Sequence, residues 1–175
     1  MNDWAEKLSY SLGEQKQLDC EIIKSNIVNC VSVQKTGLEM DKSGVDYIAT
    51  LKNGAQILID AKTRMKGCSK YWKGEPELAL EMWSVKEQRK IGWTLKEDTQ
   101  CDYILYTFPK EDSDRYYFIP FQLLRIAFLK NGRNWYSTYG SKLQLNHSYH
   151  SEAIFVPASV VLQAVQAEMT GYIHS

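Results

Sequence analysis

The chain lacks the cysteine patterns that mark disulfide frameworks and zinc knuckles. Its four cysteines are widely separated and form no Cys-x-x-Cys pair. It also has no hydrophobic run long enough to cross a bilayer, and the N-terminal Met-Asn-Asp-Trp does not have the pattern of a signal peptide. These absences predict reduced cysteines and a cytoplasmic protein that has no membrane partner.

The chain also lacks an excess of positive or negative charge, because it has 21 basic and 21 acidic residues. This balance argues against nonspecific binding of nucleic acid over the whole surface. There is no glycine-rich phosphate loop, nucleophile elbow or Ser/His/Asp set. His147 and His150 have no third ligand nearby in the sequence, so they do not predict a metal site. A chain of 175 residues can bury a sizeable core, and we expect a single domain over residues 1–175.

What is present is a hairpin signal within residues 44–63. Asn53-Gly54 is the strongest short-range hairpin signal, because both residues tolerate positive φ and apolar or β-branched residues flank them. A two-residue loop would place Tyr47 opposite Asp60. The side chains of Asp46 and Asp60 would then point to opposite faces of the sheet.

A three-residue loop over residues 52–54, with Gly54 left-handed, gives a different register and sets Asp46 opposite Asp60. Polar Thr50 then faces polar Gln56, and the apolar residues 48 and 49 face 58 and 57. The matched polarity favours this register. Lys62 lies two residues beyond Asp60 and projects from the same face.

Two adjoining carboxylates repel each other and require a positive charge between them. Oxygen ligands from carboxylates, a backbone carbonyl and water suit Mg²⁺ or Mn²⁺ rather than zinc. Lys62 would supply further positive charge, and its ammonium could orient or help deprotonate a water that attacks phosphorus. In the alternative interpretation, Asp46 is a strand-edge residue, and Asp60 and Lys62 form an ordinary surface ion pair.

The order Gly-x-Asp, hairpin, Asp-x-Lys resembles the core of the PD-(D/E)xK nuclease superfamily, which includes restriction endonucleases and Holliday-junction resolvases. Asp46 matches the first motif acid, Asp60 the second and Lys62 the lysine. Val45 stands in place of the proline that names the motif, and Asp60 stands where Glu is commoner.

The resemblance implies an α/β fold of restriction endonuclease type, in which an N-terminal helix precedes a mixed β-sheet flanked by helices. It implies a Mg²⁺- or Mn²⁺-dependent deoxyribonuclease, of the kind found in phages and mobile elements, that acts as a homodimer. Asp46, Asp60 and the Ala61 carbonyl would hold the metal. The alternative is a catalytically inactive nuclease-fold protein that binds nucleic acid or inhibits another protein.

Residues 14–25 predict a helix with an apolar stripe of Leu18, Ile22 and Ile23. Superfamily members often carry an acid on this helix, and the resemblance gives Glu14 the role of an outer metal ligand. Glu14 would also suit a purely structural role in the first turn. Glu21 is the other candidate acid.

Residues 61–74 carry basic and aromatic side chains and no acid, directly after the expected catalytic strand. Phosphate contacts with DNA are the natural interpretation, and a solvated loop is the alternative. Residues 130–142 form a second basic and aromatic stretch, which is expected to be a loop. The candidate nucleic-acid-binding residues are Arg64, Lys66, Lys70, Lys73 and Arg133.

The rest of the chain predicts a scaffold of alternating strands and helices. Strands are expected at 78–85, 101–108, 116–119 and 153–156, and helices at 120–130 and 157–170. Residues 78–85 also fit a helical stripe, but their alternation favours a strand. In that strand, Glu81 would be an accessory acid or the partner of a lysine.

Overall fold

The structure, a computed structural model, describes residues 3–146 and 148–173 and contains both helices and strands. This mixture confirms the predicted α/β class. In chain order the elements are α1 (Asp3–Asn26), β1 (Cys30–Lys35), α2 (Leu38–Lys42), β2 (Tyr47–Leu51), β3 (Gln56–Thr63), the 3-10 helix η1 (Cys68–Tyr71), β4 (Glu77–Val85), β5 (Lys90–Ile91), β6 (Tyr103–Thr107), β7 (Tyr116–Pro120), α3 (Phe121–Tyr139), β8 (Ser141–Asn146), β9 (Tyr149–Pro157) and α4 (Ala158–Ile173).

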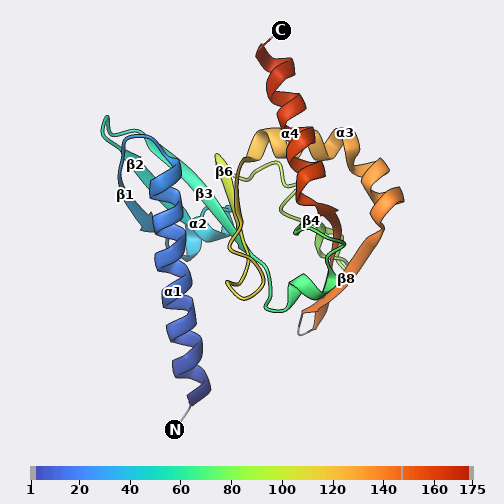
Figure 1. Ribbon diagram of the computed structural model, residues 1–175, viewed down its shortest axis with the longest axis horizontal. Helices are drawn as coiled ribbons and strands as arrows, with labels where there is room; N and C mark the ends of the chain where they lie inside the picture. The colour runs from blue at the N-terminus through green and yellow to red at the C-terminus, as the bar shows by residue number, and fades with distance from the viewer. Residues whose placement is uncertain (1–2, 147, 174–175) are drawn as a thin grey trace.

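The strands form two sheets. The first sheet has the order β1-β2-β3-β6-β7 and is mixed, because β3 and β6 run parallel and the other pairs are antiparallel. The second sheet has the order β5-β4-β9-β8 and is antiparallel. The predicted mixed sheet is present, but the second sheet was not expected. Figure 1 shows the first sheet beside α1 and the second sheet beside α3 and α4.

The β2–β3 hairpin has the register that the sequence favours. Thr50 pairs with Gln56, and residues 48 and 49 pair with 58 and 57. Gly54 has φ +84°, and its N–H donates to the Leu51 carbonyl at 2.9 Å. The three-residue turn is therefore confirmed.

Helix α1 packs on one face of the first sheet through Ile22 and Ile23, and Ile27, just after the helix, joins the same core. Leu18 was expected to join this stripe, but its side chain is 42% exposed. The prediction was wrong because Asp19 takes the inward position, where the Tyr47 hydroxyl donates to its carboxylate at 2.9 Å. A polar residue whose hydrogen bonds are satisfied can occupy a buried position of a helix, although the hydrophobic pattern predicts an apolar residue there.

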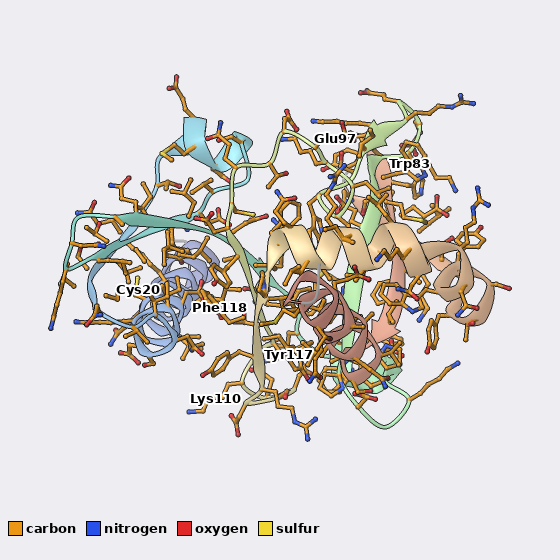
Figure 2. The ribbon with its side chains drawn as sticks, turned by 90° about the horizontal axis from the view of Figure 1, so that it is seen from above. Cys20, Trp83, Glu97, Lys110, Tyr117 and Phe118 are labelled. Atoms are coloured by element: carbon orange, nitrogen blue, oxygen red, sulfur yellow. The ribbon has the colours of Figure 1, made fainter. Side chains whose placement is uncertain are left out.

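A larger core lies on the other face of the first sheet and joins it to the second sheet and to α3 and α4. Figure 2 shows how neighbouring residues of β7 divide between the two cores. Phe118 packs in the α1 core, on the side where Cys20 lies, and Tyr117 packs in the larger core. Strand β3 alternates in the same way, so Asp60 and Lys62 face the second sheet whereas Ala61 faces α1.

The prediction of a loop over residues 130–142 is wrong, because α3 continues to Tyr139 and β8 begins at Ser141. Trp135 is buried, and its ring lies 6.1 Å from that of Phe128, two turns earlier on the same helix. This contact extends the apolar face of the helix. Gly140, with φ +71°, follows Tyr139, the last residue of α3.

The other predicted elements are present with changed bounds: β6 is shorter than the strand expected at 101–108, and the others are longer or shifted. The sequence did not predict β1, α2, η1, β5 or β8. Strand β4 confirms the strand chosen for residues 78–85, and β9 extends the short strand expected at 153–156 in both directions. No helix in the described part of the chain is long and apolar enough to cross a membrane. All four cysteines, Cys20, Cys30, Cys68 and Cys101, are free.

Candidate functional site

The structure brings Asp46 and Asp60 together at the open end of the hairpin. The Asp46 N–H donates to the Ile59 carbonyl at 2.8 Å, and the Asp46 carboxylate accepts from the Ala61 N–H at 2.8 Å. The Asp46 side chain thus takes a place in the strand ladder that a backbone carbonyl would otherwise fill. Its carboxyl group also acts on Asp60, whose pKa it raises. The two carboxyl groups therefore adjoin, as the register predicts.

Asp60 is buried, with 3% of its surface exposed, and Lys62 Nζ lies 2.6 Å from its Oδ1. Burial raises the pKa of Asp60, the Lys62 ammonium opposes that rise, and the Asp46 carboxyl adds to it, so that the pKa lies at about 7. Without a further cation, Asp60 is therefore close to half protonated at neutral pH. A divalent ion would replace that proton.

Helix α1 contributes an acid, but it is Asp19. Asp19 is buried and accepts hydrogen bonds from the Tyr47 hydroxyl at 2.9 Å and from Gln15 Nε2 at 2.8 Å. Burial raises the pKa of Asp19, those two hydrogen bonds and the charge of Lys35 oppose the rise, and the charge of Asp46 adds to it. Asp19 and Asp46 are thus electrostatic neighbours.

The sequence prediction missed Asp19, although a usable signal was present. Asp19 precedes Ile22 and Ile23 by three and four residues, which places it on their face of the helix. The predicted Glu14 side chain lies outside the described residues. Glu21 is exposed, and Gln17 donates to it at 3.1 Å. Glu21 is therefore part of the outer surface of α1 and does not contribute to the site.

A hollow of about 750 Å³, here called the Asp46 cleft, opens between α1 and the end of the first sheet. Its acidic walls come from Asp19, Asp46 and Glu111, and its basic walls from Lys16, Lys35, Arg64, Lys66 and Lys110. Ala61 also lines it. The cleft therefore combines carboxylate oxygens with cations that suit a phosphate backbone.

Lys62 lies on the opposite side of β3 and lines a smaller hollow of about 270 Å³ with Glu81 and Trp93. The Lys62 ammonium is 5.8 Å from the centre of the Trp93 ring. Burial raises the pKa of Glu81, whereas a hydrogen bond from the Trp93 N–H and the charge of Lys62 oppose that rise. Glu81 is therefore an electrostatic partner of Lys62 and lies outside the Asp46 cleft.

The predicted basic residues are only partly brought together. Arg64 and Lys66 line the Asp46 cleft, and Lys66 is paired with Glu111. Lys70 lies in η1 and Lys73 just beyond it, and both are exposed. Arg133 is exposed on α3 and does not line the Asp46 cleft or the hollow of Lys62. The candidate phosphate surface is therefore centred on Arg64.

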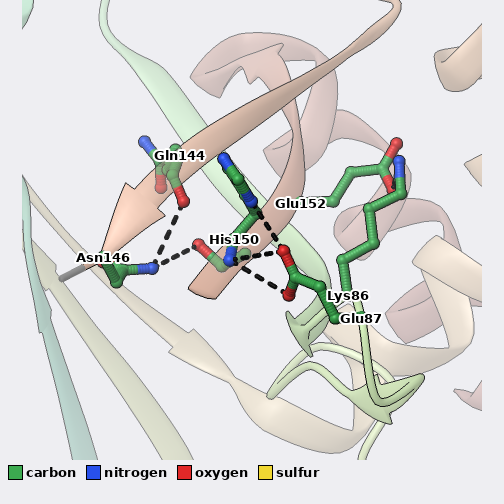
Figure 3. A network of polar contacts seen from close by, with 7 residues as sticks. Lys86, Glu87, Gln144, Asn146, His150 and Glu152 are labelled. Atoms are coloured by element: carbon green, nitrogen blue, oxygen red, sulfur yellow. Dashed lines mark hydrogen bonds and ion pairs between the residues drawn. The ribbon is translucent and has the colours of Figure 1, made fainter. Parts of the chain in front are cut away.

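Among the described residues, His150 does not contribute to a metal site. Figure 3 shows His150 joined to Glu87, whose Oε1 is 2.6 Å from the His150 Nδ1. The His150 N–H also donates to the same carboxylate, at 3.1 Å. Lys86 pairs with Glu152 nearby, at 2.9 Å. His147 lies outside the described residues, and His150 anchors one end of the β8–β9 hairpin.

The donor set at the hairpin suits a hard divalent ion. Asp46 and Asp60 supply adjoining carboxylates, and the carbonyl of Ala61 lies between Asp60 and Lys62 in the chain. Among the described residues, no group of three or more acidic, histidine or cysteine side chains is placed to hold a metal. Two carboxylates completed by a carbonyl and water agree with how Mg²⁺ is bound.

Comparisons with protein-family models, curated proteins and solved structures find no match for this chain.

Proposed function

We propose that this protein is a Mg²⁺- or Mn²⁺-dependent nuclease that hydrolyses phosphodiester bonds in DNA. The observation that carries the proposal is the convergence of three side chains from one hairpin. The carboxylates of Asp46 and Asp60 adjoin, and the Lys62 ammonium lies 2.6 Å from Asp60. This is the arrangement that the resemblance to the PD-(D/E)xK superfamily implies.

Asp46, Asp60 and the Ala61 carbonyl would hold the metal. When bound, the divalent ion polarises the scissile phosphate and lowers the pKa of the attacking water. The hydrogen bond from the Ala61 N–H fixes the Asp46 carboxylate in place, which limits the reorganisation needed on binding. Asp60 is withdrawn from solvent, so its interactions with neighbouring charges are stronger than they would be in water.

Lys62 would position the attacking water, and stabilise the developing charge, for a phosphate held at the edge of β3 between the Asp46 cleft and the smaller hollow that Lys62 lines. Its ammonium is held by Asp60 on one side and lies near the Trp93 ring on the other. Asp19 would receive a proton or order water at the α1 side of the cleft, because its pKa is raised and it is an electrostatic neighbour of Asp46. The cations of the cleft would neutralise the flanking phosphates.

The proposal includes the restriction endonuclease-like fold and a homodimer. A helix, an antiparallel hairpin that carries the acids and the parallel strand β6 beside it support the fold assignment. One site hydrolyses one strand at a time, so a second copy would be needed to cut both strands of a duplex. Sedimentation with and without duplex DNA tests the dimer.

The function is tested by incubating the purified chain with labelled single-stranded, duplex and branched DNA. We expect cleavage of at least one substrate with Mg²⁺ or Mn²⁺ and none with EDTA. The Asp46→Asn variant should be inactive, and the Asp98→Asn variant, changed at an exposed acid, should match the wild type. Cleavage that persists in EDTA, or that survives Asp46→Asn, would overturn the proposal.

A second candidate is the inactive nuclease-fold protein, acting as a nucleic-acid-binding or protein-inhibiting module. The observation that favours it is the Lys62–Asp60 ion pair, which places a cation beside the buried carboxyl group in the absence of a metal. In that case no substrate would be cut, and DNA binding would be the same with EDTA as with Mg²⁺.

A further inference from the structure

A second hollow of about 380 Å³ adjoins the Asp46 cleft, and the two share Arg64 and Lys66. Its volume is within the range of small-ligand sites. The hollow is formed mainly by the first basic and aromatic stretch together with β8 and β9, and Lys142 is the residue of the second stretch that lines it. Arg64 and Tyr71 come from the segment after β3, and Lys142 comes from β8. We call this hollow the Tyr71 pocket.

The Tyr71 pocket has an excess of positive charge. Arg64 lies 4.7 Å and Lys142 5.0 Å from the centre of the Phe155 ring, so both cations are held against one aromatic side chain. In the described part of the chain, neither has a carboxylate within ion-pair distance. The Nε of Arg64 is buried without a hydrogen-bond partner among the described atoms. Cations without a carboxylate partner favour the binding of an anion beside them.

Glu77 is the one acid among the described residues that line the Tyr71 pocket. It is buried, and its burial raises its pKa in spite of the opposing charges of Lys142, Lys73 and Arg64. Arg64, Lys70 and Lys142 outnumber this single carboxyl group among the described residues that line the pocket. The pocket therefore presents positive charge to a ligand.

The aromatic residues that line the Tyr71 pocket indicate which class of anion it binds. Tyr71 is 68% exposed, and its ring lies 6.0 Å from the Lys142 ammonium. Trp72 and Phe155 line the same pocket. Aromatic side chains that alternate with cations are the usual means of binding single strands, because bases stack on the rings and phosphates contact the cations. In a duplex the bases are already stacked and paired, so they cannot reach such rings.

We propose that the Tyr71 pocket binds an unpaired nucleotide of a DNA strand whose backbone continues into the Asp46 cleft. Arg64 lies four residues beyond Asp60, a separation of about 13 Å along an extended chain, so it links the two hollows. The inference rests on the proposed nuclease function and specifies its substrate as DNA with a single-stranded segment beside the cut. Arg64 and Lys142 contact the phosphate, and Tyr71 stacks on the base.

The test measures binding of the full chain to a labelled oligothymidine of about 12 nucleotides and to a duplex of the same length. Ca²⁺ replaces Mg²⁺, so that turnover is blocked. Tyr71→Ala is expected to weaken single-strand binding about tenfold and to leave duplex binding unchanged. Tyr71→Phe, which keeps the ring, should bind both as the wild type does.

The phosphate contact is tested through salt dependence. Lys142→Ala should reduce the slope of log affinity against log salt for the single strand by about 0.7. Lys90→Ala, which removes an exposed cation from β5 of the same sheet, should leave that slope unchanged. Free dTMP should compete at least about tenfold more weakly than the strand, because it lacks the neighbouring phosphates. Equal affinities would overturn the assignment to a strand.

The outcomes separate this inference from the nuclease proposal. If the wild type cuts DNA but Tyr71→Ala binds the single strand normally, or Lys142→Ala and Lys90→Ala behave alike, the Tyr71 pocket is not a nucleotide site. If the binding pattern holds but no substrate is cut, the pocket stands and the nuclease proposal fails. Thermal unfolding of each variant identifies any loss of binding that follows from unfolding.

Discussion

At the scale of single residues, the buried carboxyl of Asp60 connects metal binding to folding. Its pKa lies at about 7 in the native chain, against an ordinary value of 3.8. In the unfolded chain it returns to the ordinary value. Between these two pH values the native state binds more protons than the unfolded state, so its stability falls as pH rises.

We therefore expect the free energy of unfolding of the metal-free wild type to fall, relative to Asp60→Asn, as pH rises from about 4 through about 7. The relative change should be up to about 4 kcal/mol, since one pKa unit corresponds to about 1.4 kcal/mol. Urea denaturation over this pH range measures it. The Asp98→Asn variant, changed at a side chain that is 80% exposed, should follow the wild type.

Mg²⁺ at neutral pH should then stabilise the wild type by binding the native state and displacing the Asp60 proton. Asp60→Asn should lose this stabilisation. Equal stabilisation of the two proteins would show that Asp60 is not a metal ligand, whatever the outcome of the cleavage assay.

Lys62 is expected to act in the chemical step and to contribute little to binding. Lys62→Ala should slow cleavage by at least about a hundredfold and leave DNA affinity in Ca²⁺ close to that of the wild type. The reason is that one cation contributes little to a broad phosphate surface. Lys52→Ala, at the exposed hairpin turn, is the matched control. Normal cleavage by Lys62→Ala would mean that the catalytic cation lies elsewhere.

At the scale of elements, local chemistry decided what the sequence could predict. The β2–β3 register follows from Asn53-Gly54 and from the matched polarity of facing residues, and the structure has that register. The phase of α1 depends on a hydrogen bond between Asp19 and Tyr47, 28 residues apart. In α3, Trp135 packs against Phe128 seven residues earlier, a helical spacing that was present in the sequence but was assigned to a loop. The spacing of a residue can show its face of a helix, but it does not show the distant partner that a buried polar residue finds.

The turn itself provides a prediction on stability. Gly54→Ala places a side chain at φ +84°, although no neighbouring atom would contact the added methyl group. The free energy of unfolding should therefore fall by about 1–2 kcal/mol from backbone strain alone. Gly37→Ala, where φ is negative and space is also open, is the control. If Gly54→Ala unfolds as the wild type does, the three-residue turn is not left-handed at this position.

At the scale of the whole molecule, the second sheet was the feature furthest from sequence reasoning. Strands β4 and β9 pair residues that are 69 to 80 positions apart in the chain, from Trp83 with Glu152 to Glu77 with Pro157. Each strand could be predicted from its own sequence, but the sequence of a single strand does not indicate which sheet the strand joins. The consequence for function is that β8 and β9 supply Lys142 and Phe155 to the Tyr71 pocket beside the hairpin.

The formal net charge is zero, so any affinity for DNA depends on where the cations lie. We expect the segment after β3 to provide that affinity. Neutralising Arg64, Lys66, Lys70 and Lys73 together should weaken duplex binding in Ca²⁺. It should also reduce the slope of log affinity against log salt by up to about 0.9 for each phosphate that the protein no longer neutralises. Lys66 should contribute least, since Glu111 already pairs with it.

A matched variant neutralises four exposed cations elsewhere, namely Lys24, Lys52, Arg89 and Lys90. It carries the same net charge as the first variant, so any difference between the two slopes reports on position and not on total charge. We expect the control to keep the wild-type slope, and the metal-dependent stabilisation to be the same in both variants. Equal slopes in the two variants would show that the segment after β3 is solvated and does not bind the phosphates.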